Sequence, residues 1–145
     1  MEMSANTGHS PYLLGIVEGF YGRAWSWQDR SDYARSMLGM GLNSYLYAPK
    51  SDPYLRKRWR EHWPEDQWQC LQEFSTQCRS NGILWGLGLS PFELYRNYDS
   101  PGKIQLREKL RRINELKPDL LAVLFDDMPG AQTDLASCQH RIVAD

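Results

Sequence analysis

The stretch Leu120-Leu121-Ala122-Val123-Leu124-Phe125-Asp126-Asp127 decides the fold and also points to a site. Six apolar residues run without a break into two adjacent carboxylates, and such a run is typical of a parallel strand that is buried on both faces. Two carboxylates held close together and partly buried raise the pKa of one of them. One group then stays ionised while the other can carry a proton near neutral pH, as general acid catalysis requires. The alternative is a solvated loop in which the pair only caps the next helix.

The composition fits one soluble globular domain and argues against several classes of protein. The 145 residues are 41% hydrophobic and 24% charged, with a formal net charge of -1. Such a balance gives no general attraction to nucleic acid or to an anionic membrane. The basic run from Arg56 to Arg60 contains Trp59, and we interpret it as a solvated loop with aromatic anchors rather than a nucleic-acid surface. No apolar run is long enough to cross a bilayer.

The cysteines and histidines predict neither disulfides nor metal. The three cysteines are odd in number and irregularly spaced, which favours reduced thiols and a cytoplasmic location. Residues 1–10 are polar and are expected to be a disordered tail without a signal peptide. His62 and His140 have no partners at metal-ligand spacing, so we expect no metal site and no cofactor. The cysteines are Cys70, Cys78 and Cys138.

The order of apolar segments predicts four strand-helix units, hence an α/β fold with a parallel sheet and helices outside it. Residues 11–145 then form one domain. One helix is expected to begin after a capping box at Ser26 and to carry Tyr33, Met37 and Met40 on one side. A later helix is expected to point Lys109 outward. The expected strands are 12–17, 43–47, 83–89 and the opening stretch, and the expected helices run to about Gly41, over 64–82, over 102–118 and from Leu135 to the end.

The unusual residues all follow strands. In parallel α/β folds the carboxyl ends of the strands form the ligand face, so these residues are expected to gather on one side of the sheet. For Glu18, a buried structural role is as plausible as a functional one. The segments concerned are Gly19–Gly22, Lys50 with Asp52, Ser90-Pro91, and Asp126-Asp127.

Three of these segments resemble one family. Gly15–Arg23 with Trp25, then Leu42–Lys50 with Asp52, then Leu124–Asp127, are similar to the catalytic domain of family 84 glycoside hydrolases. That family includes protein O-GlcNAcases and hyaluronidase-like β-N-acetylglucosaminidases. The stretch with Tyr54, Arg56 and Trp59-Arg60 also fits its pattern, and the resemblance covers nearly the whole chain from Leu14 onward.

The resemblance implies a (β/α)₈ barrel that hydrolyses terminal β-linked N-acetylglucosamine with retention, acting on a glycan or a glycoprotein. The substrate's own acetamido oxygen attacks and forms an oxazoline, an exception to the usual pair of enzyme carboxylates. Asp126 would orient the acetamido N–H, and Asp127 would be the general acid and then the base. Gly19, through its backbone, and Lys50 would bind the sugar, and Tyr21 would line the pocket.

The chain has room for only part of such a barrel. A (β/α)₈ barrel usually needs about 250 residues, so four units correspond to its first half, with strand edges and an apolar inner face left open. The chain could pair with a second copy, flatten into an open flavodoxin-like layer, or be part of a longer gene product. We expect a homodimer. A catalytically inactive half-barrel with weak sugar binding or a self-association role is the alternative to an active enzyme.

Overall fold

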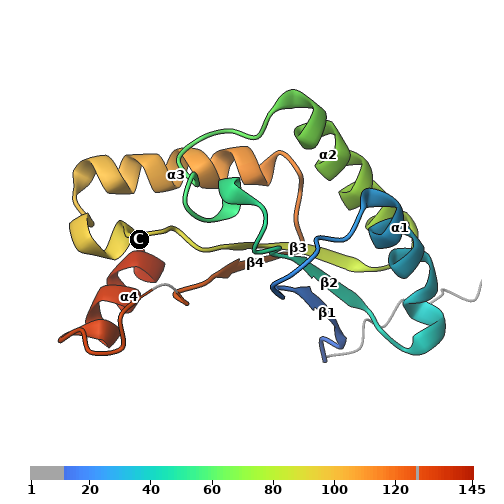
Figure 1. The fold of residues 1–145 in the computed structure, drawn as a ribbon, viewed down its shortest axis with the longest axis horizontal. Helices are drawn as coiled ribbons and strands as arrows, with labels where there is room; N and C mark the ends of the chain where they lie inside the picture. Colours follow the sequence, from blue (N-terminus) through green and yellow to red (C-terminus); the bar gives the residue numbers. More distant parts are fainter. Residues whose placement is uncertain (1–11, 127) are drawn as a thin grey trace, which may run out of the picture.

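A computed structural model describes residues 12–126 and 128–145, and these form a parallel four-stranded sheet with alternating helices (Figure 1). The expected α/β class is therefore confirmed. The sheet order is β1-β2-β3-β4, which is also the order along the chain. The strands are β1 (Gly15–Glu18), β2 (Ser44–Tyr47), β3 (Leu84–Leu89) and β4 (Leu120–Val123), and the α-helices are α1 (Trp27–Ser36), α2 (Glu65–Ser80), α3 (Ser100–Asn114) and α4 (Leu135–Ala144).

One face of the sheet is covered by helices. In Figure 1, α1, α2 and α3 lie above the sheet. Alternate residues of β2 and β3 point to this side, as the two-residue period of a strand requires. The ring of Tyr45 meets that of Phe74 from α2 edge-to-face, with centroids 5.0 Å apart. The fully buried side chains that form this core include Tyr45, Tyr47, Leu71, Trp85, Leu87 and Leu89.

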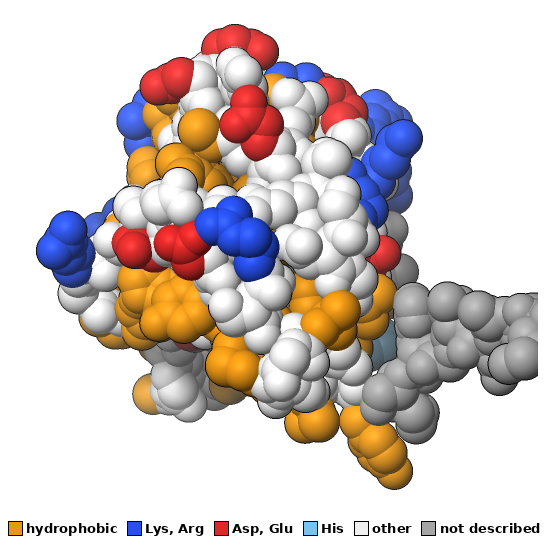
Figure 2. Space-filling model, turned by 90° about the vertical axis from the view of Figure 1, so that its right-hand side faces the viewer, with side chains coloured by type: hydrophobic (Ala, Val, Ile, Leu, Met, Phe, Trp, Pro, Cys, Tyr) orange, Lys and Arg blue, Asp and Glu red, His pale blue; other side chains and the backbone are white. Residues whose placement is uncertain are grey.

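The opposite face of the sheet is open and apolar. Val17 of β1 points to this side and is 63% exposed. In the side view of Figure 2, several hydrophobic side chains lie along the lower part of the molecule, and most of the charged side chains lie above them. The molecule therefore has one well-buried core and one uncovered sheet surface.

Two glycines of β3 leave no room for a side chain in the middle of this open face. A Cβ atom added to Gly86 would lie 2.6 Å from the Cβ of Leu120, which no real structure accommodates without movement. A Cβ atom at Gly88 would lie 2.6 Å from the Cβ of Ala48 and 3.0 Å from Cδ1 of Leu124. Because these two positions of β3 carry no side chain, the segments that follow β2 and β4 can approach each other across the open face.

The expected burial of the opening stretch on both faces is wrong. Within β4, Leu121 is 43% exposed and the other three residues are only half-buried. The reason is that β4 lies at the edge of the sheet and pairs with β3 alone. β3, paired on both sides, is instead buried from Trp85 to Leu89.

Helix α1 starts as expected and ends earlier. The Ser26–Asp29 capping box is present, but the helix ends at Ser36 and a 3₁₀ turn, η1 (Leu38–Met40), follows. Of the three residues expected on one side of this helix, Met37 is buried while Tyr33 and Met40 are exposed. The change from 3.6 to 3.0 residues per turn moves Met40 off the stripe.

Lys109 of α3 was expected to point outward, and this is also wrong. Its side chain is 2% exposed. The Nζ atom donates to the carbonyl oxygen of Glu61 at 2.9 Å and lies 3.4 Å from the ring centroid of Trp63. The loop before α2 covers this part of α3, and helical spacing within α3 could not reveal a loop from elsewhere in the chain.

Across residues 12–126 and 128–145, no helix combines the length and the apolar character needed to span a membrane.

Candidate active site

Three side chains meet at the carboxyl ends of three neighbouring strands. Lys50 follows β2, Ser90 follows β3 directly, and Asp126 comes three residues after β4. The register pairs Leu89 with Val123, and the N–H of Leu124 then donates to the carbonyl oxygen of Leu89 at 2.8 Å. This continued pairing brings Asp126 beside Ser90, although the two are 36 residues apart in sequence.

Asp126 is held by both of its carboxylate oxygens. Nζ of Lys50 forms an ion pair with Oδ2, and the hydroxyl of Ser90 donates to Oδ1 at 3.0 Å. The side chain of Asp126 is 36% exposed. Partial burial acts to raise its pKa, but the hydrogen bonds from Lys50 and Ser90 outweigh burial and hold the pKa below the ordinary value. Asp126 is therefore an ionised carboxylate at neutral pH, open to solvent on one side.

The loop after β1 reaches the same region. The ring centroid of Tyr21 lies 5.9 Å from Nζ of Lys50, and the ring itself is exposed. The N–H of Gly19 donates to the carbonyl oxygen of Val17 at 2.9 Å. A Cβ atom at Gly19 would meet only Cγ1 of Val17, at an ordinary 3.7 Å, so packing among the described residues does not require glycine at this position.

The expected gathering of residues at one end of the sheet is thus seen for Tyr21, Lys50, Ser90 and Asp126. The roles assigned to Gly19, Lys50, Tyr21 and Asp126 stay predictions. Asp127, the expected general acid, lies outside the described residues. The sequence places Ser90 directly after a strand but indicates no role for it, because its partner Asp126 follows a different strand.

Glu18 and Asp52, two further carboxylates near strand ends, belong to buried networks. Glu18 accepts from Nε of Arg30 at 2.9 Å, from its Nη2 at 2.7 Å, and from the hydroxyl of Tyr45 at 2.6 Å. Asp52 accepts from Nε1 of Trp63 at 2.9 Å, among other donors, and burial raises its pKa despite these hydrogen bonds. Both carboxylates stabilise the scaffold, so the open question about Glu18 is answered in favour of the structural role.

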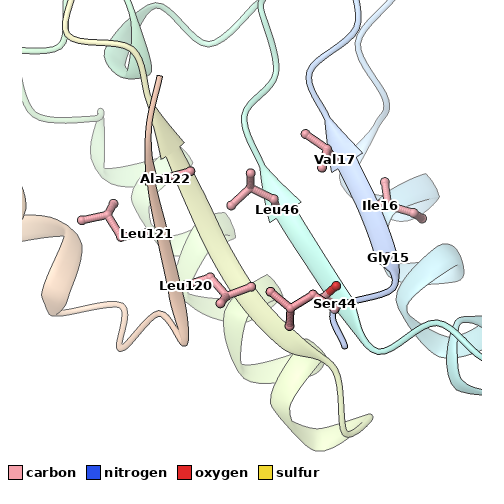
Figure 3. A pocket seen from close by; sticks show the side chains of 9 residues that line it. Gly15, Ile16, Val17, Ser44, Leu46, Leu120, Leu121 and Ala122 are labelled. Carbon is pink, nitrogen blue, oxygen red and sulfur yellow. The ribbon is translucent and has the colours of Figure 1, made fainter. Parts of the chain in front are cut away.

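An apolar hollow lies elsewhere, on the open face of the sheet (Figure 3). It has a volume of about 380 Å³ and includes none of Lys50, Ser90 and Asp126. Its lining is apolar and has few polar groups, which does not suit a sugar. The hollow is therefore an uncovered apolar face of the sheet rather than a sugar-binding pocket. Its lining residues come from β1, β2 and β4 and include Gly15, Val17, Ser44, Leu46, Leu120 and Ala122.

The donor atoms of a metal site are not brought together in the described part of the chain. Among these residues, no three His, Cys, Asp or Glu side chains form a group that could hold an ion. The cysteines at 70, 78 and 138 are all free thiols.

Comparison with known proteins gives one consistent result. A family model described as beta-N-acetylglucosaminidase matches residues 14–144. The protein O-GlcNAcase of Mus musculus is 33% identical over 127 residues, which are 87% of this chain and 14% of the mouse protein. The protein O-GlcNAcase of Rattus norvegicus is 34% identical over 122 residues, 83% of this chain and 13% of the rat protein.

Solved structures agree with the sequence matches. A mutant of the Thermobaculum terrenum O-GlcNAc hydrolase superposes with a TM-score of 0.82 at 31% sequence identity. The match covers 91% of this chain and 30% of that structure. The chain therefore spans about a seventh of the length of the curated relatives and under a third of the solved one.

Proposed function

This chain belongs to the β-N-acetylglucosaminidase family, glycoside hydrolase family 84, and we propose that it takes part in retaining hydrolysis of terminal β-linked N-acetylglucosamine. The observation that carries the proposal is the carboxylate of Asp126, ionised and solvent-facing between Lys50 and Ser90. Family membership makes the chain a hydrolase by resemblance. The reaction, the residue roles and the activity of these 145 residues are our proposal.

Asp126 is proposed to bind the acetamido N–H of the sugar. When the acetamido oxygen attacks the anomeric carbon, positive charge develops on the nitrogen as the oxazoline forms. An ionised carboxylate stabilises that charge. The lowered pKa of Asp126 fits this role, because the group must stay deprotonated through the working pH range.

Asp127 is proposed to be the general acid, protonating the departing oxygen and then deprotonating the water that opens the oxazoline. The two adjacent carboxylates would divide the work, with Asp126 staying ionised and Asp127 carrying the proton. The ionised state of Asp126 supports this division, because a nearby negative charge favours the protonated form of the second carboxyl.

Gly19, Lys50 and Tyr21 are proposed to bind the sugar. The room left beside Gly19 supports close approach of a hydroxyl to the backbone, as expected where glycine is not required by the fold. Lys50 would exchange part of its contact with Asp126 for a sugar hydroxyl. The exposed ring of Tyr21 would line the pocket. The substrate class we propose is a glycan or glycoprotein bearing N-acetylglucosamine.

A second copy of the chain is proposed to cover the open face of the sheet. The four strands run parallel in the order β1-β2-β3-β4, so β1 and β4 are both edges. A two-fold axis along the strand direction would place β4 of one copy beside β1 of its partner, twice, and so close eight parallel strands. The apolar hollow would then be filled by side chains.

Sedimentation tests this dimer. At micromolar concentration we expect a dimer, and Val17→Lys on the hollow should dissociate it. Leu38→Lys, an equally apolar-to-charged change at an exposed site on η1, should not. A stable monomer of the unaltered chain would overturn the dimer.

Hydrolysis of a chromogenic N-acetylglucosaminide tests the activity. Turnover should be abolished by Asp127→Ala and retained in Asp66→Ala, an exposed carboxylate in the first turn of α2. The alternative is the inactive half-barrel, favoured by the open apolar face. Absence of turnover at every protein concentration, with the fold intact, would establish that alternative for this chain.

We propose a cytoplasmic location, supported by the three free thiols. Fractionation of cells expressing the tagged protein tests it.

A further inference from the structure

We propose that Ser90 is a positioning residue that fixes the orientation of the Asp126 carboxylate for the acetamido group. The proposal rests on the proposed function, and it adds a residue to the site that the sequence motifs did not include. Three observations support it. Ser90 is buried, and it makes one hydrogen bond through its backbone N–H and another through its hydroxyl. The two carboxylate oxygens of Asp126 also have different partners, Ser90 and Lys50.

Ser90 is itself immobilised. Its side chain is buried, and its N–H donates to the carbonyl oxygen of Leu55 at 2.8 Å. Leu55 belongs to a short 3₁₀ turn, η2 (Pro53–Leu55), and its side chain is fully buried. The hydroxyl of Ser90 is therefore presented from a point anchored to the core, which is the condition for a residue that holds another in place.

The hydrogen bond from Ser90 determines which carboxylate oxygen of Asp126 can accept a hydrogen bond from the substrate. The hydroxyl donates to Oδ1 at 3.0 Å, while Oδ2 faces Lys50. With Oδ1 engaged by a rigid donor, rotation of the carboxylate about its Cβ–Cγ bond breaks a hydrogen bond. The carboxylate plane is thereby fixed, and Oδ2 is left as the atom that can accept the substrate N–H when Lys50 moves aside.

The alternative is that Ser90 merely fills space at the end of β3. The two roles differ in their effect on Asp126. Among the described residues, the charged side chain in contact with Asp126 is Lys50, and Tyr21 is the titratable group beside Lys50. The carboxyl of Asp127 follows Asp126 directly in the sequence. A space-filling serine can be replaced without altering the titration of this carboxylate, whereas a donor that stabilises its ionised form cannot.

Titration of the Asp126 carboxyl carbon by NMR, assigned with Asp126→Asn, tests the proposal on the full chain. In Ser90→Ala we expect the midpoint to move to higher pH, and in Ser90→Thr, which keeps a hydroxyl, we expect it to return toward that of the unaltered protein. Ser75→Ala is the matched control, because Ser75 is an equally buried serine whose hydroxyl donates to the carbonyl oxygen of Gln72 in α2. If Ser90→Ala does not fold, Ser90→Cys, a weaker donor of similar shape, should shift the midpoint in the same direction.

Steady-state kinetics supply the second measurement. We expect Ser90→Ala to lower kcat by about tenfold with little change in KM, because orientation matters most in the transition state. An unchanged Asp126 midpoint in the folded Ser90→Ala and Ser90→Cys variants would overturn the proposal. A shifted midpoint in a chain without any turnover would keep the positioning role and reject the proposed function instead.

Discussion

Glu18 and Asp126 are carboxylates at the two edges of the same sheet, and the structure uses them in opposite ways. Glu18 is the last residue of β1 and lies fully buried against Arg30 and Tyr45. Asp126 follows β4 and keeps 36% of its side chain exposed between Lys50 and Ser90. Each has a cation and a hydroxyl as partners. What differs is the access of solvent, and hence of a ligand, to the remaining lone pairs.

The comparison shows that position after a strand does not by itself make a carboxylate functional. The oxygens of Glu18 face three donors inside the core, so a ligand cannot reach them. Those of Asp126 meet one cation and one hydroxyl at the surface. Incomplete enclosure leaves the Asp126 carboxylate accessible to a ligand, as its proposed role requires, whereas complete enclosure makes Glu18 part of the scaffold.

The largest expected effect is on stability, from Glu18→Ala. This change leaves Arg30 buried without its partner, which should lower the free energy of unfolding by about 3–5 kcal/mol. Urea unfolding at pH 7 measures the change. Glu61→Ala is the control, because Glu61 pairs with Arg58 at an exposed site and its loss should be too small to detect. If Glu18→Ala lowered the free energy of unfolding by less than about 1 kcal/mol, Glu18 would contribute no more than an exposed ion pair, and the contrast drawn with Asp126 would be wrong.

Lys109 allows the effect of burial to be tested on an ammonium group that has no carboxylate in direct contact with it. The quantity affected is the pH dependence of the free energy of unfolding. Burial lowers the pKa of Lys109 to about 7, against the opposing attraction of Asp52 and Glu61, from the ordinary 10.5. Between these values the unfolded chain binds a proton that the folded chain does not, so the stability of the protein should rise with pH, by at most about 1.4 kcal/mol per pH unit.

Urea unfolding between pH 7 and 10 measures this slope in the unaltered protein and in Lys109→Met. The slope should disappear in the variant and persist in Lys57→Met, a change at an exposed lysine. An equal slope in Lys109→Met would show that the ammonium group is hydrated rather than enclosed.

The smallest expected effect on stability comes from Asp126→Asn. The pair with Lys50 is partly exposed, so its loss at pH 7 should lower the free energy of unfolding by under about 1 kcal/mol. Because the pKa of Asp126 is lowered on folding, its contribution is present above the ordinary value of 3.8 and is lost as pH falls through the lower folded value. As pH is lowered from 6 to 3, the difference in the free energy of unfolding between the variant and the unaltered protein should therefore shrink. A variant that stays less stable by the same amount throughout would contradict this.

The arrangement of the strand ends could be predicted from sequence because it follows from topology alone. Alternation of strands and helices dictates a parallel sheet, and a parallel sheet brings Lys50, Ser90 and Asp126 to one end. Asp52 also lies near a strand end, but its hydrogen bond from Trp63 depends on the irregular segment between them folding back on itself. Sequence spacing does not contain that information.

Burial was harder to predict than topology for the same reason. The apolar run that begins at Leu120 predicts a strand buried on both faces. In the structure β4 lies at the edge of the sheet, and it would be buried in this way only with a further neighbour beyond it. Lys109 fits the polar side of its helix, and only the loop carrying Glu61 and Trp63 places it inside. The local sequence pattern indicates whether a residue tends to be buried or exposed. Contacts with distant parts of the chain determine whether it actually is.

The missing side chain at Gly88 has a consequence for how this site could be lost by mutation. Every glycine codon is one base from an alanine codon. At position 88 the added methyl group would collide with Ala48, two residues before Lys50, or with Leu124, two residues before Asp126. The lysine and the carboxylate would be forced apart by an atom that touches neither of them. A mutational scan restricted to the residues of the proposed site would overlook this position, where one base change could disrupt the site while leaving every residue in it intact.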